Sequence, residues 1–168
     1  MGDDGAGQLS DYDNTSEEIF WRSAPGRYAV ALGPEERALL KELPLQLRQA
    51  FSDDPQGANF RRLFPPAYAA DVDAEAGYRS LVGKELEDNK AAALETLSRT
   101  ADATELTADE LDAWLRALND IRLWLGTLLD VSEEETSDEP QDPPHILYHV
   151  LTALQSLVID TLAEDFDV

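Results

Sequence analysis

The sequence predicts a mainly α-helical protein, a small helical bundle with a short N-terminal β-hairpin. Three observations predict this fold class. Apolar residues recur at helical spacing in three long segments, helix-start signals precede several segments, and residues near the N-terminus mix aromatic and β-branched side chains. With 168 residues, 43% of them hydrophobic, the chain is long enough to bury one core. We therefore expect a single helical domain over residues 18–168.

The first elements follow from local signals. Residues 19–32 surround the turn sequence APGR at 24–27, which predicts two short strands joined by a turn. Pro34, followed by two glutamates, predicts a helix start, and leucines at helical spacing continue this helix over 39–47. Proline lacks a backbone N–H, so Pro44 is expected to kink or divide the helix.

Three further helices are predicted. Residues 73–101 contain no proline and several strong helix formers, which favours one long helix. Thr107 and Glu110 have the spacing of a capping box, in which each side chain accepts a hydrogen bond from the other residue's backbone N–H. This box begins a helix that we expect to end near Leu129. A proline pair begins the last helix, over 143–163.

Acidic residues dominate the charge, with 35 Asp and Glu against 13 Lys and Arg and a net charge of −22. About half of these acids lie in three segments without a basic residue, at 1–18, 130–142 and 160–168. Such segments repel themselves and bury little apolar surface, so we predict a disordered acidic tail over 1–17 and a disordered acidic loop over 131–142. The negative surface argues against direct nucleic-acid binding and against membrane binding.

Several classes of site have no support in the sequence. The chain has no cysteine, which excludes disulfides, thiolate metal sites and thiol nucleophiles. His145 and His149 have a spacing that could share a metal, but we interpret them as a solvated pair. Gly77 and Gly83 are too far apart for a phosphate loop, and Glu85 stands where such a loop needs a hydroxyl. We expect no enzyme activity, cofactor or metal, and a cytoplasmic location.

The helix that begins after Thr107 is apolar over much of its circumference and is therefore expected to be central. At the helical step of about 100° per residue, Arg122 lies about 40° from Leu118, inside the apolar arc. Four polar residues fall outside this arc: Arg116, Asn119, Asp120 and Thr127.

Gln155 lies inside the apolar face of the last helix and is the expected partner of Arg122. Glu85 or Asn89 of the long helix could join them, and Asn119 and Asp120 complete the candidate polar network or anion site. Two interpretations stay open. The network is a structural clasp that fixes the helix register, or it is an anion pocket centred on Arg122.

A second candidate site is a partner patch of arginine and aromatic side chains, formed by Arg62, Phe64, Tyr68 and Arg79. Two or three arginines are too few for nucleic-acid binding against the net charge of −22. The acidic balance instead favours a basic protein partner, docked on this patch or on the acidic loop. A homodimer also stays open.

Three sequence strings support a resemblance to a known family. They are RLFP at 62–65, YR at 78–79, and the fairly specific WLRALNDIRLWLG at 114–126. Over about residues 20–162 the chain resembles the actinobacterial domain-of-unknown-function family 2017, the AosR-like oxidative-stress transcriptional regulator family. The resemblance extends to Tyr148 and Gln155 near the end of the chain.

This resemblance implies an acidic, helical, non-enzymatic regulator that acts through a sigma factor or another transcription protein. Family members are often encoded near the Clp-protease adaptor, so an accessory role in that adaptor system is an alternative. A small-anion sensor that uses Arg122 and Gln155 is a second alternative. The thiol switch attributed to such regulators cannot operate in this cysteine-free chain. The family supplies no established catalytic or binding residue.

Overall fold

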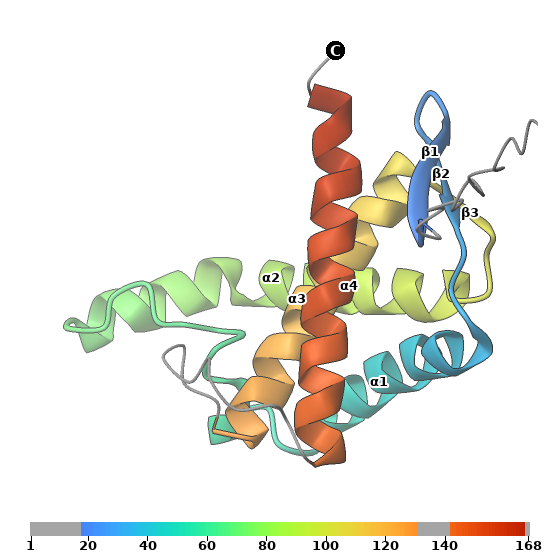
Figure 1. The fold of residues 1–168 in the computed structure, drawn as a ribbon. Coiled ribbons are helices and arrows are strands. Elements are labelled where there is room, and N and C mark those ends of the chain that lie inside the picture. Colours follow the sequence, from blue (N-terminus) through green and yellow to red (C-terminus); the bar gives the residue numbers. More distant parts are fainter. Residues whose placement is uncertain (1–17, 131–141, 167–168) are drawn as a thin grey trace, which may run out of the picture.

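The computed structural model describes residues 18–130 and 142–166, which form four α-helices and one three-stranded antiparallel sheet (Figure 1). In chain order the elements are β1 (Phe20–Ala24), β2 (Arg27–Val30), α1 (Pro34–Asp53), the 3-10 helix η1 (Ala58–Phe60), α2 (Val72–Thr100), β3 (Glu105–Thr107), α3 (Ala108–Leu128), α4 (Pro143–Ala163) and the 3-10 helix η2 (Glu164–Phe166). The mainly helical fold class is confirmed. The predicted disordered tail at 1–17, and the acidic loop except Asp142, lie outside the described residues.

The predicted N-terminal hairpin is confirmed, and a third strand joins it. β1 and β2 pair antiparallel with Phe20 opposite Val30, and the turn between them contains Gly26 at a φ of +66°, which favours glycine. β3 adds antiparallel to β2 with Leu106 opposite Tyr28. β3 has no counterpart among the predicted elements, because three residues are too few to show an alternating pattern.

Local signals set the helix starts as predicted. Pro34 begins α1. At α3 the capping box is confirmed: Thr107 Oγ1 accepts from the backbone N–H of Glu110 at 3.2 Å, and Glu110 Oε2 accepts from that of Thr107 at 3.0 Å. α1 continues through Pro44, so the predicted division there is wrong. Buried leucines on both sides of the proline hold the helix against its neighbours and compensate for the lost hydrogen bond.

α3 is the central helix, as expected, and packs against α1, α2 and α4. Trp114, Leu118 and Ile121 have no exposed surface. Two residues predicted to lie outside the apolar arc, Asp120 and Thr127, are also buried, at 3% and 8% exposure. A helical wheel of one helix does not show that neighbours cover opposite sides of it, so the position of these two residues outside the arc did not predict their burial.

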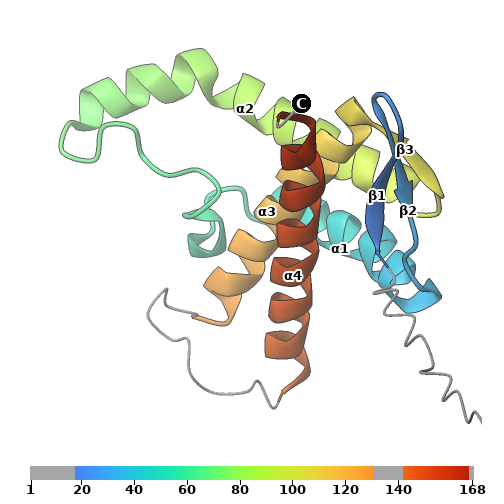
Figure 2. The ribbon, with the colours of Figure 1, turned by 45° about the horizontal axis from the view of Figure 1, so that its top comes forward.

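The first part of α2 projects from the body of the molecule (Figures 1 and 2). No residue of α2 is buried before Ala93, whereas Leu94, Leu97 and Thr100 are buried against the core. We call residues 72–89 the arm. Asp71 caps the start of the helix: its Oδ1 accepts from the backbone N–H groups of two residues in the first turn. The segment between η1 and α2 lies beside the arm in both views.

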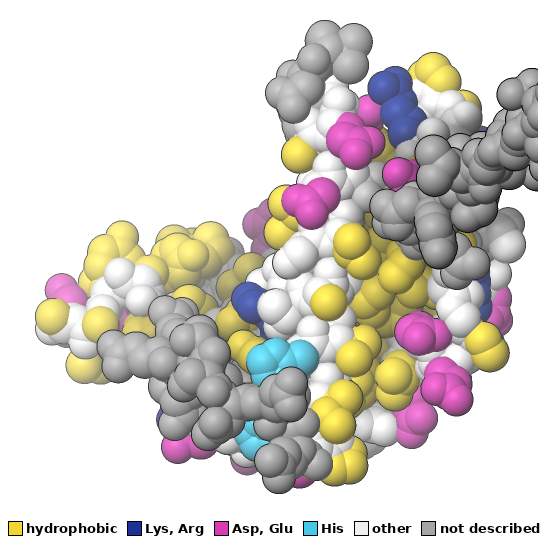
Figure 3. Space-filling model, in the orientation of Figure 1, with side chains coloured by type: hydrophobic (Ala, Val, Ile, Leu, Met, Phe, Trp, Pro, Cys, Tyr) yellow, Lys and Arg dark blue, Asp and Glu magenta, His cyan; other side chains and the backbone are white. Residues whose placement is uncertain are grey.

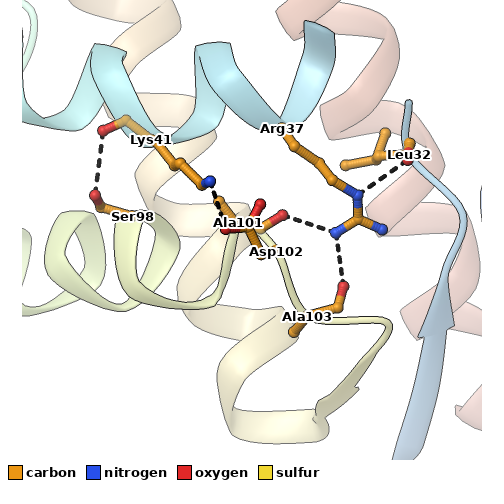
Figure 4. Close-up of polar contacts among 7 residues, drawn as sticks. All are labelled: Leu32, Arg37, Lys41, Ser98, Ala101, Asp102 and Ala103. Atoms are coloured by element: carbon orange, nitrogen blue, oxygen red, sulfur yellow. Dashed lines mark hydrogen bonds and ion pairs between the residues drawn. The ribbon is translucent and has the colours of Figure 1, made fainter. Parts of the chain in front are cut away.

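Arg37 ties the start of α1 to two other parts of the chain (Figure 4). Its Nε donates to Leu32 O at 3.0 Å and its Nη2 donates to Val30 O at 3.1 Å. Its Nη1 donates to Ala101 O and Ala103 O, both at 2.8 Å. One guanidinium therefore joins the β2–α1 connection to the turn between α2 and β3.

Candidate functional site

The predicted polar network is only partly assembled, between α3 and α4. Gln155 Nε2 of α4 donates to Asn119 Oδ1 of α3 at 3.2 Å. Gln155 therefore pairs with Asn119 and not, as predicted, with Arg122. Arg122 Nε is buried and has no hydrogen-bond partner within the described part of the chain. Glu85 and Asn89, the other predicted partners, are exposed on the arm.

Asp120 lies apart from this pair and is held by α2. Lys90 Nζ lies 2.8 Å from Asp120 Oδ1, and the carboxylate side chain is 4% exposed. Burial raises the pKa of Asp120 above its ordinary value, and the Lys90 ammonium opposes that rise. Lys90 was not among the predicted site residues, because nothing in its sequence context distinguishes it from a surface lysine. The four predicted network residues therefore do not form one site.

Gly126 marks a close approach of α3, α4 and the segment after η1. A Cβ at this position would lie 3.1 Å from Tyr148 Cε2 and 3.2 Å from Arg62 Nη1. The Arg62 guanidinium therefore lies at the junction of α3 and α4, one helical turn beyond Arg122. The sequence analysis did not predict that Arg62 would approach α3 and Tyr148.

Phe64, Tyr68 and Arg79 of the predicted patch lie together, beside the first half of the arm. Arg79 Nη2 donates to Phe64 O at 3.4 Å, and Arg79 Nε lies 2.7 Å from Glu75 Oε1. Glu75 Oε2 also accepts from the Tyr68 backbone N–H at 2.9 Å. The hydrogen bond from Arg79, with that of Tyr68, lowers the pKa of Glu75. Tyr68 packs edge-on against Tyr78, with ring centroids 6.1 Å apart.

Two hollows flank this patch. The larger, of about 530 Å³, lies between the arm and the segment that precedes it. Aromatic rings, three basic side chains (Arg61, Arg79 and Lys84) and two acidic ones (Glu75 and Glu87) line it. The smaller, of about 390 Å³, lies between α1 and α2 and includes Phe64 and Lys90 in its lining. Lys90 Nζ stands 5.8 Å from the centre of the Phe64 ring. Both hollows are lined by apolar side chains together with charged groups of both signs, a lining that suits an amphipathic peptide.

The histidines and their acidic neighbours were checked as metal ligands among the described residues. Within residues 18–130 and 142–166, no group of three or more His, Asp or Glu side chains has the arrangement of a metal site. His145 Nδ1 lies 2.8 Å from Asp142 Oδ2, and the hydrogen bond from the imidazole lowers the pKa of that aspartate. His149 lies beside the Tyr148 ring instead. α4 is long and apolar enough, by length and composition alone, to cross a membrane.

Comparison with known proteins supports the resemblance seen in the sequence. The oxidative stress regulators AosR of Mycobacterium bovis and Mycobacterium tuberculosis are each 28% identical to the chain, over 85% of its length and 85% of theirs. A relative from Mycobacterium leprae is 29% identical, over 79% of this chain and 81% of its own length. No solved structure matches the chain significantly. The model of a domain of unknown function, DUF2017, matches residues 17–162, and the chain therefore belongs to the DUF2017 family.

Proposed function

We propose that this protein is a non-enzymatic, transcription-associated regulator that acts by binding a basic protein partner, such as a sigma factor, through the arm. The observation that carries the proposal is the exposure of large apolar side chains along the arm and the segment before it. Their exposed fractions are 84% for Leu81, 83% for Val72, 50% for Tyr68 and 40% for Tyr78. Figure 3 shows hydrophobic side chains gathered on this projecting part of the molecule. An apolar patch of this kind typically marks an interaction site.

The charges around the arm suit a partner that combines apolar and polar contacts. The hollow of about 530 Å³ beside the arm can accept apolar side chains, while Glu87 in its lining can bind a basic side chain of the partner. At longer range the net charge of −22 attracts a protein that is basic overall. Specific contacts and long-range attraction thus come from different parts of the chain.

The relatives support a regulatory role. The names of all three relatives described above include the words oxidative stress regulator, and the family to which the chain belongs is defined by sequence without an assigned activity. A cysteine-free chain cannot sense oxidation with a thiol of its own. The proposal therefore assigns regulation to the binding of a partner and not to chemistry on this chain.

Binding measurements with the full chain test this proposal. Purified sigma factors, RNA polymerase core and the Clp-protease adaptor of an actinobacterium are passed over the immobilised protein at about 50 and about 200 mM salt. We expect one sigma factor to bind, more weakly at the higher salt, and Leu81→Glu to weaken binding at least about tenfold. Leu45→Glu is the matched control, because Leu45 is 55% exposed on α1.

Three outcomes would overturn this proposal. They are the absence of binding by every transcription protein, equal losses for Leu81→Glu and Leu45→Glu, and binding of the Clp-protease adaptor alone. The last outcome would favour the accessory role in protein degradation.

A second candidate function, small-anion sensing, rests on Arg122. Its buried Nε lacks a hydrogen-bond partner within the described residues, and a buried donor of this kind favours an anionic ligand. Titration calorimetry with inorganic phosphate and sulfate tests it, with Arg122→Gln as the variant. Arg116→Gln is the control, because Arg116 is exposed on the same helix. An anion site is supported if the wild type and Arg116→Gln release binding heat with one of these anions and Arg122→Gln does not. The absence of binding heat for the wild type with both anions would rule out this function.

A further inference from the structure

The outward side of α4 carries an apolar stripe that the described elements leave partly exposed. Inward-facing Leu151, Leu154 and Val158 are buried against the rest of the molecule. The outer stripe follows alternating intervals of four and three residues: Ile146, Val150, Ala153 and Leu157. Ile146 and Leu157 are 46% and 38% exposed. This spacing is the heptad pattern by which one helix packs along another.

The stripe is also free of charge over most of its length. From Pro143 to Ile159 α4 contains no Asp, Glu, Lys or Arg, although the chain has a net charge of −22. A basic partner finds no carboxylate to pair with there. Two copies of this acidic chain repel each other over most surfaces, and α4 is a face on which they can approach without that repulsion. These charges favour a second copy of the chain as the occupant.

Two polar side chains beside the stripe set the orientation of such a pair. His149 and Asp160 are both exposed, and neither has a side-chain hydrogen bond or ion pair within the described part of the chain. They are separated by about 16 Å along the helix axis, at about 1.5 Å per residue. In a parallel pair each would meet its own counterpart, which places two carboxylates together. In an antiparallel pair each His149 meets the Asp160 of the other copy.

We propose that the protein forms a symmetric dimer in which α4 packs antiparallel against α4 of a second copy, with His149 hydrogen-bonded to Asp160 across the interface at both ends. The two-fold axis then passes between Ala153 and Ser156. These side chains are small, so the helix axes can approach to about 8 Å. The dimer surface is separate from the arm, and the inference does not depend on the proposed function.

A lipid membrane is the alternative to a second copy, because α4 is long and apolar enough by length and composition to cross one. The inner side of α4 is buried, and Gln155 of α4 donates a hydrogen bond to Asn119 of α3. These contacts attach α4 to α3, and the two helices lie against each other in Figures 1 and 2. A helix that crossed a bilayer would have to break these contacts. A helix that pairs with a second copy keeps them.

Sedimentation equilibrium of the full chain tests the dimer. We expect the wild type to have twice the chain mass of 18.6 kDa at micromolar concentration. Ala153→Glu places two carboxylates near the axis and should raise the dimer dissociation constant at least about tenfold. Ala38→Glu, at an exposed position of α1, is the matched control and should leave the constant unchanged. Far-UV circular dichroism verifies that each variant folds. If Ala153→Glu does not fold, Ser156→Glu is measured in its place.

Disulfide cross-linking tests the orientation without interference, because the chain has no cysteine of its own. A mixture of His149→Cys and Asp160→Cys chains should give a covalent dimer under mild oxidation. Each variant alone should give none.

Four results would overturn the proposal. They are a monomeric wild type at high micromolar concentration, a dimer that Ala153→Glu and Ser156→Glu leave intact, cross-linking of either cysteine variant with itself only, and flotation of the wild type with phosphatidylcholine vesicles in place of dimerisation. The last result would assign the stripe to a lipid surface.

Discussion

Replacement of Lys90 by methionine should destabilise the fold through a buried carboxylate. The variant keeps most of the aliphatic stem but removes the ammonium that lies 2.8 Å from Asp120 Oδ1. The Asp120 side chain is 4% exposed, so water cannot replace the lost partner. Removal of one member of a buried ion pair typically costs about 3–5 kcal/mol. We expect about 3 kcal/mol at pH 7, toward the lower end because the carboxyl group can take up a proton instead.

The stability lost in Lys90→Met should depend on pH, in a direction that follows from the pKa of Asp120. Burial raises this pKa in the folded protein, and without Lys90 the rise is larger. The folded state then binds the proton more tightly than the unfolded state, so the free energy of unfolding falls as the pH rises from the unfolded pKa through the folded one. Lys90→Met should therefore cost more at pH 7 than at pH 5. Adding Asp120→Leu should recover most of the loss and remove this pH dependence.

Urea unfolding, followed by circular dichroism at pH 7 and pH 5, measures these free energies. Lys84→Met is the matched control on the same helix, since Lys84 is 87% exposed and pairs with an exposed Asp88. We expect it to change the free energy of unfolding by no more than about 0.5 kcal/mol. A loss below about 1 kcal/mol for Lys90→Met at pH 7, or an equal loss at both pH values, would refute the reasoning.

Three further substitutions test the fold by thermal and urea unfolding. Arg37→Ala leaves four backbone carbonyls without their donor and should cost about 3 kcal/mol, or about 6–12 °C in Tm. Thr107→Ala removes the cap of α3 and should cost about 1 kcal/mol. Trp114→Phe loses the buried hydrogen bond from Nε1 to Thr100 Oγ1, 2.7 Å long, and should cost about 2 kcal/mol. Trp21→Phe, at a 39% exposed position, should change stability little.

Each of these substitutions has an outcome that would contradict the structure. An Arg37→Ala protein with wild-type Tm would mean that solvent replaces the guanidinium. An unchanged stability of Thr107→Ala would mean that the helix start does not depend on the side-chain cap. Equal effects of Trp114→Phe and Trp21→Phe would place Trp114 outside the core.

Most of the helical fold could be predicted because its boundaries depend on local chemistry. Proline at the first helical position, acidic first turns and the capping box of Thr107 and Glu110 act over a single turn, so one sequence is enough to locate them. The hairpin was predictable for the same reason, since its turn contains the glycine at positive φ. The family resemblance, carried by the strings at 62–65 and 114–126, was confirmed as well.

The parts that could not be predicted depend on contacts between distant segments. Lys90 reaches Asp120 across 30 positions, and Arg37 binds carbonyls 64 and 66 positions away. Neither residue differs in its local sequence from an ordinary surface cation. Gln155 illustrates the same limit, because the periodicity placed it correctly on the inner face of α4 but could not distinguish Asn119 from Arg122 as its partner.

The projecting α2 has a mechanical consequence. A single helix contributes both buried residues of the core, from Ala93 to Thr100, and the exposed arm, so the direction of the arm is fixed by the packing of its other end. The arm spans about 27 Å at about 1.5 Å per residue. A partner held near Val72 would thus be kept at a set distance from the acidic body, with α2 as a spacer. If the packing of Leu94 and Leu97 loosened, the arm would no longer be held in one direction. A change at the buried end of α2 would then alter the position of a partner bound near Val72.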